Sequence, residues 1–311
     1  MASQKTKDTS SEIRKQVSEQ IVALMESDGL MWVKGFDGSM FMAQNPISPT
    51  RYSGTNRAWL ALIQKGRHIT DPRWATFLQV KEKGWRIKRG AHAAKVECWK
   101  PVPCVLENNR RKYLKKDEVA LYNPEDVFWP LCLVNIASVF SYADIDGPSD
   151  YVPAPLPLGF EFADALIATS RCPVYEAAIT AACYRPGPDE IVMPPRGAYD
   201  SPAEYTSTLL HEMAHSTIVP LARKTPDSFR DCAYAYEELC AELASVFAEA
   251  ELGLPLGRAR LENHAAYLQS WVECCKSDSD AMNSALTCAQ GIADYLVANV
   301  NVNANVNVDV A

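Results

Sequence analysis

Two histidines and a glutamate in the segment H-E-M-A-H, residues 211–215, have the types and spacing that a hydrolytic metal site requires. Side chains four residues apart on a helix project from the same face, one turn above the other. His211 and His215 can therefore bind one zinc ion at about 2.0–2.1 Å. Glu212 can reach a zinc-bound water and serve as general base. The motif predicts a zinc site, with a chance match as the alternative.

The neighbouring sequence favours a helix at this position. Ser201-Pro202 is typical of a helix start, because proline fits the first turn. An apolar face then follows, made of Tyr205, Leu209, Leu210 and Met213. We therefore expect a helix over residues 203–218, with the two histidines near its end.

The third zinc ligand must come from elsewhere, because catalytic zinc usually has three protein ligands and one open position. No histidine occurs in residues 219–223. The segment E-E-L-C-A-E-L-A-S-V-F, residues 237–247, reads as the next helix and carries Glu238 and Glu242 on one face. One can bind the metal while the other orients a metal-bound histidine. We favour Glu238 as the ligand and Glu242 as the orienting residue; a solvated helix face is the alternative.

Two further features near the motif have two interpretations each. His264 lies alone in a predicted helix, where histidine is more often structural than metal-binding. The strand expected at Glu190–Met193 could hold an extended peptide by β-augmentation, or it could be purely structural.

The charges along the chain are strongly asymmetric. Residues 51–116 contain 17 Lys or Arg and 4 Asp or Glu, a net charge of +13. Residues 117–311 have a net charge of −19, and the whole chain has −7. This sign change indicates that the first part faces a polyanion; a solvated basic face is the alternative.

Aromatic rings lie among these basic residues, at Tyr52, Trp59, Trp74, Phe77, Trp85, Trp99 and Tyr113. Cations follow a phosphate backbone and rings stack on unpaired bases, so the pattern favours single-stranded nucleic acid. We expect at least half of the rings to be core, Trp59 and Phe77 first. The candidate DNA contacts are Arg51, Tyr52, Arg57, Arg73, Trp74, Lys81, Trp85, Arg86, Lys88 and Arg89.

The elements that must position these residues predict an α+β fold. We expect an N-terminal domain of mixed helix and sheet over residues 1–146, a proline-rich linker at 147–157, a mainly helical domain at 158–298 and a disordered tail at 299–311. In the first domain we predict a helix after Thr9, helices at 58–64 and 74–83, strands at 85–88, 95–102 and 128–140, and a hairpin at Asn108-Asn109. In the second we predict helices at 159–170, 203–218, 234–252, 260–275 and 279–298.

The composition excludes several classes. No apolar run is long enough to span a membrane, and the polar N-terminus has no apolar core typical of a secretory signal, so we expect a cytoplasmic protein. The ten cysteines contain no C-x-x-C pair and are interpreted as small buried hydrophobes.

Taken together, the motifs resemble the ArdC family of plasmid antirestriction proteins over most of the chain. The likeness rests on R-Y-S-G-T-N at 51–56, P-R-W-A-T-F at 72–77, G-W-R-I-K-R-G at 84–90 and V-N-I-A at 134–137, then D-E-I-V-M-P at 189–194, L-L-H-E-M-A-H at 209–215, Y-E-E-L-C-A-E-L at 236–243 and N-H-A-A-Y-L-Q-S-W at 263–271. Ala137-Ser138 departs from the family's usual glutamine, and Ser216 stands where tryptophan is common.

The resemblance implies a single-stranded-DNA-binding domain, related to part of the TraC-type primases, joined to a zincin-like metallopeptidase domain that binds a divalent metal, Zn²⁺, and acts on a peptide or protein. It also implies a plasmid-encoded protein that protects incoming plasmid DNA during conjugation and acts in the recipient cell. The alternative function is a DNA-binding protein with a structural or inactive metal site, which protects DNA by coating it.

Overall fold

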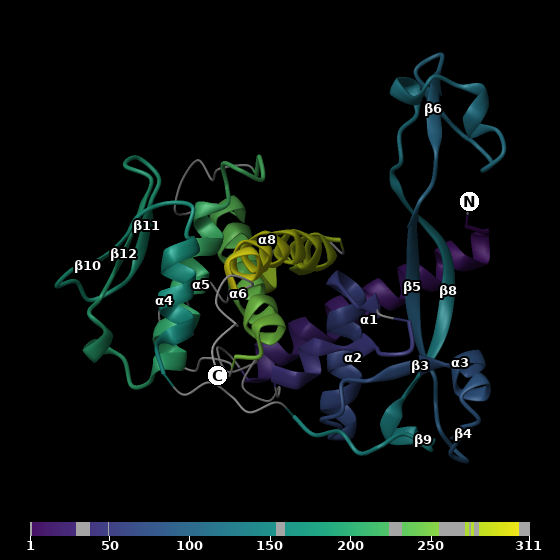
Figure 1. Ribbon diagram of the computed structural model, residues 1–311, viewed down its shortest axis with the longest axis horizontal. Helices are drawn as coiled ribbons and strands as arrows, with labels where there is room; N and C mark the ends of the chain where they lie inside the picture. Colours follow the sequence, from purple (N-terminus) through teal and green to yellow (C-terminus); the bar gives the residue numbers. More distant parts are fainter. Residues whose placement is uncertain are drawn as a thin grey trace.

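The N-terminal half of the chain is built around helices that pack against a long two-stranded ribbon (Figure 1). The computed structural model describes residues 2–28, 38–48, 50–153, 159–223, 232–254, 271–273, 275–276 and 280–304. Helix α1, Gln4–Asp28, confirms the first predicted helix but begins before Thr9, and it buries Ile13, Val17 and Ile21. Helix α2, Gly54–Arg67, is longer than the predicted 58–64.

The ribbon supplies two strands of a three-stranded antiparallel sheet in the order β3-β8-β5, in which β8 is central. Strands β5, Ala94–Pro101, and β8, Leu131–Ser141, confirm two predicted strands. The prediction of a helix over 74–83 was wrong at its start, because β3, Trp74–Thr76, pairs with the end of β8. Thr76 then caps helix α3, Phe77–Glu82, through a hydrogen bond from the Gln79 amide.

The turn before α2 connects this sheet to the helices. Gly54 has a φ of +52°, a conformation that favours glycine. Two residues later, the Asn56 side chain accepts a hydrogen bond from the Glu97 amide and donates one to the Glu97 carbonyl, both at 2.8 Å. The R-Y-S-G-T-N motif therefore joins α2 to strand β5.

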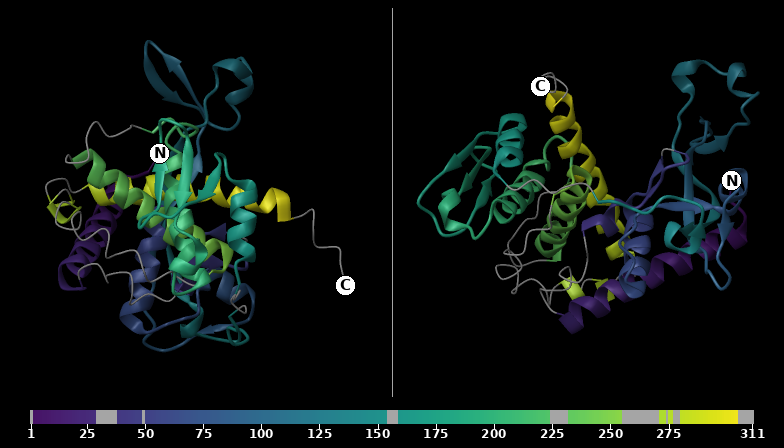
Figure 2. Two further views of the ribbon diagram at one scale, coloured as in Figure 1. Left: turned by 90° about the vertical axis from the view of Figure 1, so that its left-hand side faces the viewer. Right: turned by 60° about the horizontal axis from the view of Figure 1, so that its bottom comes forward.

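A hairpin arm extends the ribbon away from the rest of the chain (Figures 1 and 2). It contains β6, Cys104–Glu107, and β7, Arg110–Tyr113. Asn108 and Asn109 form the predicted turn, both with positive φ, which asparagine tolerates better than most residues. We use the term arm for residues 102–130.

The C-terminal half places a small sheet beside helices, at the end of the molecule opposite the arm (Figure 1). Helix α4, Glu161–Thr169, precedes strands β10, Val174–Glu176, β11, Cys183–Arg185, and β12, Glu190–Met193. The sheet order is β10-β12-β11. Strand β12 is therefore central, which leaves it no free edge for a peptide and favours its structural interpretation.

Among the described residues, three long helices follow the sheet. They are α5, Pro202–Ser216, α6, Cys232–Leu252, and α8, Ala281–Ala304. Helix α8 continues past the expected end at 298, so residues 299–304 are helical instead of disordered. Residues 305–311, His264 and most of the helix predicted at 260–275 lie outside the described residues.

The remaining described elements are short. They are β1, Gln44–Asn45, β2, Thr50–Arg51, β4, Arg86–Ile87, and β9, Ile145–Asp146, with 3₁₀ turns at Gly38–Met42, Val119–Leu121, Pro124–Asp126, Tyr142–Asp144 and Arg196–Ala198. Within the described residues, no helix is both long and apolar enough to cross a membrane.

One hydrophobic core runs through both halves. Its buried members include Val17 of α1, Ala61 of α2, Leu209 of α5, Phe247 of α6 and Leu286 of α8. The proline-rich segment at 147–157 marks the change from sheet to helices, but the apolar core is continuous on either side of it. The two halves are therefore packed against each other, not merely tethered.

Candidate metal centre and nucleic-acid surface

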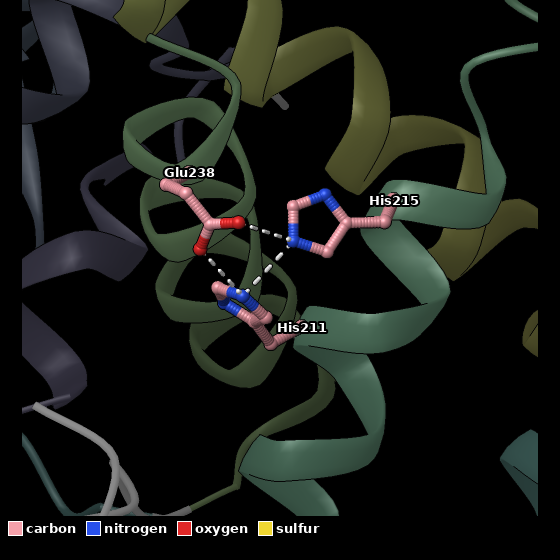
Figure 3. Close-up of side chains that lie close together, drawn as sticks. All are labelled: His211, His215 and Glu238. Carbon is pink, nitrogen blue, oxygen red and sulfur yellow. Dashed lines mark hydrogen bonds and ion pairs between the residues drawn. The ribbon is translucent and has the colours of Figure 1, made fainter. Parts of the chain in front are cut away.

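Helix α5 places both histidines of the H-E-M-A-H motif in the interior. It begins as expected, with Pro202 in its first turn and the Ser201 hydroxyl accepting a hydrogen bond from the Glu204 amide at 3.2 Å. Its apolar face is buried in the core. His211 is 3% exposed, and His215 lies one turn later on the same side (Figure 3).

Glu238 of α6 completes a group of three converging ligand atoms (Figure 3). The Nε2 atoms of His211 and His215 are 3.1 Å apart. Each lies 3.5 Å from an oxygen of the Glu238 carboxylate. Tetrahedral metal–ligand bonds of about 2.0–2.1 Å give ligand–ligand distances of about 3.4 Å. Two imidazoles and one carboxylate at these separations fit a single divalent metal ion, and the structure brings together the three residues expected from the sequence.

The outer nitrogen of each imidazole also faces a carboxylate. His211 Nδ1 lies 3.4 Å from Glu242, the residue that we expected to orient a histidine. His215 Nδ1 lies 3.1 Å from Glu237, which the sequence reasoning missed. Such partners fix the ring orientation and the tautomer of a metal-binding histidine. Glu237 directly precedes Glu238 in the sequence. The adjacent pair of glutamates was therefore the one sequence feature that could have indicated a second carboxylate at the site.

Arg223 extends this support beyond Glu237. Its guanidinium forms an ion pair with Glu237 and donates to the Ala214 carbonyl at 2.8 Å and to the Thr217 hydroxyl at 3.0 Å. A cation at a helix C-terminus satisfies carbonyls that lack partners within the helix. Arg223 thereby connects the end of α5 to the carboxylate that holds His215.

The carboxylates control the protonation of the centre in the absence of metal. Burial alone lowers the pKa of His211, but the hydrogen bonds to Glu238 and Glu242 more than offset this and raise the pKa to about 10. Without metal, the imidazole of His211 is therefore protonated on both nitrogens at neutral pH. A metal ion must displace one of these two protons in order to bind.

Glu212 is buried and is held by the small sheet. Its carboxylate accepts a hydrogen bond of 2.7 Å from the Tyr184 amide of β11. The Tyr184 hydroxyl donates to Asp189 at 2.8 Å, and Arg171 donates to the same carboxylate at 2.7 Å. Arg171 also donates to the Ser216 carbonyl at 3.1 Å. Glu212, the expected general base, therefore projects from α5 and is fixed by its hydrogen bond to the edge strand β11.

The expected DNA contacts divide into buried and exposed residues. Tyr52, Arg57 and Trp74 are in the core, so assigning them to DNA was wrong. Arg57 pairs with Glu251 of α6, and its guanidinium lies 4.7 Å from the centre of the Phe247 ring. Because Arg57 lies in a strongly basic segment, the sequence around it did not indicate that its partner is Glu251 of α6.

Two more residues that we expected to contact DNA have side chains that already interact with neighbouring residues. Arg73 is half-buried and pairs with Asp71 at 2.8 Å. Trp85 is half-buried and packs edge-on against Tyr142, with ring centres 5.5 Å apart. Both can offer only part of their surface to DNA.

The other expected contacts are exposed. Arg51 is exposed near Glu251, and Lys81, Arg86, Lys88 and Arg89 are exposed on and after α3; we call these last four the basic surface. Phe77, which we expected in the core, is 58% exposed, whereas Trp59 is partly buried as expected. Phe77 and Lys81 are four residues apart on α3 and therefore share one helix face.

Comparison with known proteins identifies the class of each half. Residues 161–287 match the family model of a zincin-like metallopeptidase, and residues 11–128 match the N-terminal domain of the anti-restriction factor ArdC. The chain thus combines a zincin-like domain with an ArdC N-terminal domain. Two crystal structures of antirestriction ArdC protein from the R388 plasmid, Mn(II)-bound and metal-free, resemble the whole chain. They are 26% identical, with TM-scores of 0.67 and 0.68, and cover 92% and 93% of this chain and 97% and 98% of theirs.

The chain therefore has the two-domain composition of an ArdC N-terminal domain followed by a zincin-like domain, and it is similar to ArdC in structure. It is also 28% identical to the uncharacterized protein y4eC of Sinorhizobium fredii, covering 96% of this chain and 95% of that protein. Two DNA primases TraC of Escherichia coli are 29% and 30% identical over 91% of this chain. The chain spans only 20% and 27% of the length of these primases.

Proposed function

We propose that this protein binds single-stranded DNA non-specifically, carries a zinc-dependent peptidase site, and protects incoming plasmid DNA from restriction during conjugation. The peptidase proposal rests on the convergence of His211, His215 and Glu238. Beside them, the Glu212 carboxylate is held by a hydrogen bond from a backbone amide. The DNA half rests on the exposed cations of the basic surface and on the match of residues 11–128 to the N-terminal domain of the anti-restriction factor ArdC. A plasmid-encoded protein with this role acts in the cytoplasm of the recipient cell.

At the metal centre, His211, His215 and Glu238 hold the ion. The Mn(II)-bound relative supports a divalent metal, and the two imidazoles with one carboxylate favour zinc. When bound, the ion supplies Lewis acidity that lowers the pKa of a coordinated water and polarises a peptide carbonyl. Glu242 and Glu237 keep the imidazoles oriented, and their negative charge favours the cation.

Glu212 accepts a proton from the attacking water and delivers it to the leaving amine. Its carboxylate is already desolvated and is fixed by the Tyr184 amide, so little reorganisation is needed. Strand β11 is an edge of its sheet among the described strands. An extended peptide or protein segment can add to that edge, which brings a peptide bond beside Glu212.

On the other half, the basic surface holds the phosphate backbone without reading sequence. Lys81, Arg86, Lys88 and Arg89 are exposed, although Lys88 also donates to the Ala143 carbonyl at 2.8 Å, and Phe77 offers an exposed ring on the same helix face as Lys81. An exposed ring adjoining exposed cations favours unpaired bases over duplex.

The test is metal analysis combined with binding of single-stranded and double-stranded DNA, on the wild-type protein and His211→Ala. We expect wild-type protein to contain one zinc ion and to prefer single strands, with the logarithm of affinity falling linearly with the logarithm of salt concentration. His211→Ala should lose the metal and retain DNA binding. A flat salt dependence between about 50 and 200 mM would contradict the DNA assignment.

The alternative function is protection by coating alone, with a structural or inactive metal site. Glu212→Gln separates the two, because it should leave metal and DNA binding intact while abolishing peptide cleavage. Plasmid transfer into a restricting recipient is then measured with this variant. Undiminished protection would exclude proteolysis as the mechanism.

A further inference from the structure

The hairpin arm has two different faces, which follow from its strand register. Phe128 pairs with Cys104 of β6 by two backbone hydrogen bonds of 2.8 Å, and Cys104 pairs on its other side with Tyr113 of β7. Directly opposed residues in antiparallel strands point to the same side. Leu106 and Arg111, two residues further along their strands, are opposed to each other and share that side.

The opposite face of the arm carries Val105, Glu107, Arg110 and Lys112. Val105 there is 3% exposed. Beside it, Lys112 donates to Glu107 at 2.7 Å and to the Tyr122 hydroxyl at 3.0 Å. The carboxylate of the hairpin strands is thus on the opposite face, where it is exposed but already paired with a cation.

The open face carries apolar and aromatic groups with a cation. Phe128 is 49% exposed and Leu106 is 57% exposed, and Arg111 is exposed directly opposite Leu106. Cys104, in the middle of its row, is itself buried. A sheet face with rings and a guanidinium, and with its acid on the other side, is complementary to a polyanion that has flat apolar groups.

We propose that this open face of the arm stacks and binds single-stranded DNA, as a second contact separate from the basic surface. The proposal rests on the proposed DNA-binding function. Strand β5 spans eight residues, or about 26 Å, between the segment after the basic surface and the arm. The β5–β8 ribbon therefore holds the two contacts apart, and one DNA strand can touch both. The Phe128 ring supplies stacking and Arg111 supplies a phosphate contact.

The experiment measures the affinity of full-length protein for a single-stranded oligonucleotide of about 16 nucleotides between about 50 and 200 mM salt. Phe128→Ala should weaken binding by about 5-fold or more, with an unchanged salt slope, because stacking releases no counterions. Arg111→Ala should reduce the slope by about 0.7. Circular dichroism confirms that the variants, all at exposed positions, remain folded.

Matched controls lie on the same arm. Leu121→Ala removes an apolar side chain that is 79% exposed and lies in the 3₁₀ turn Val119–Leu121, outside strands β6 and β7, and Arg110→Ala removes a cation from the other face. Both should change binding less than their counterparts.

Each further outcome is decisive. If Phe128→Ala and Arg111→Ala bind like wild type while a Lys88→Ala, Arg89→Ala double variant is weakened, the arm proposal fails and the DNA-binding function stands. If the arm variants retain DNA affinity but lose protection in cells, the face binds a protein and the proposal also fails. Absence of wild-type binding would overturn the proposed function itself.

Discussion

The metal centre and the basic surface differ in what surrounds their polar side chains. In the centre, His211 is 3% exposed and faces a carboxylate at each ring nitrogen, so its position is set before any ligand arrives. On the basic surface, Arg86 and Lys88 are exposed and act by charge. A buried site depends on each member, because an unpaired polar group in the interior is costly. An exposed site depends on the sum of its charges, so single substitutions change it little.

The comparison can be tested most strongly at Arg57 and Arg51, which lie near the same carboxylate. Arg57→Met leaves Glu251 buried without its main partner and should lower the free energy of unfolding by about 3–5 kcal/mol. Arg51→Met is the matched control, because Arg51 is exposed and 3.9 Å from Glu251; it should cost less than about 1 kcal/mol. Urea denaturation measures both, and equal effects would contradict the buried role of Arg57.

The next largest effect is expected behind the metal ligands. Glu237→Gln keeps the shape of the side chain but removes the charge that holds His215 and pairs with Arg223. Metal affinity should fall by about 10- to 100-fold while the fold is retained. Competition with a chromogenic chelator measures this, with the exposed Glu19→Gln as the control. Wild-type affinity would show that His215 needs no support.

A pH-dependent effect is expected where α1 meets strand β5. Burial alone raises the pKa of Glu97, but hydrogen bonds from Arg14, Ser10 and Trp99 outweigh it and lower the pKa below its ordinary value. The stabilisation is therefore present above the unfolded pKa of about 4.3 and is lost as pH falls through the folded pKa. Glu97→Gln should cost about 1.5 kcal/mol at neutral pH, and less in acid. Thermal unfolding at several pH values measures this; a pH-independent difference would contradict the ionised pair.

The smallest effects are expected on the basic surface. Lys88→Ala and Arg89→Ala should each reduce the salt slope of single-stranded DNA binding by about 0.7, without changing the unfolding free energy by more than about 0.5 kcal/mol. Titrations at several salt concentrations measure the slopes. Loss of all binding from one substitution would show that this surface behaves like a buried site.

Local sequence patterns predicted most helices and strands and the two histidine ligands of the metal centre. The spacing of His211 and His215 requires only a helix, and Asn108-Asn109 requires only a turn. Glu238 could be predicted because the segment E-E-L-C-A-E-L-A-S-V-F indicates a helix with acidic residues on one face. Its approach to α5 is a tertiary contact that this local pattern does not itself specify. The alternative ligand Glu242 faces the outer nitrogen of His211, an arrangement that spacing alone could not decide.

Distant partners account for what could not be predicted. Trp74 belongs to a strand because the end of β8 pairs with it, and the local sequence reads equally well as helix. Arg57 is buried because Glu251 lies opposite it on α6. Phe77 is exposed because α3 packs through Val80 instead. In each case the deciding residue is far away in sequence, or belongs to a face that composition does not identify.

The shared core of α1, α2, α5, α6 and α8 has a consequence for how this protein can be divided or inherited. A fragment cut at the proline-rich segment would expose apolar helix faces to water on both pieces, which favours aggregation. A deletion that removes either half should therefore destabilise the other. The longer TraC primases match this chain across 91% of its length, as a single block within a larger polypeptide. The exposed cations of the basic surface and the metal-ligand cluster therefore depend on the same hydrophobic interior.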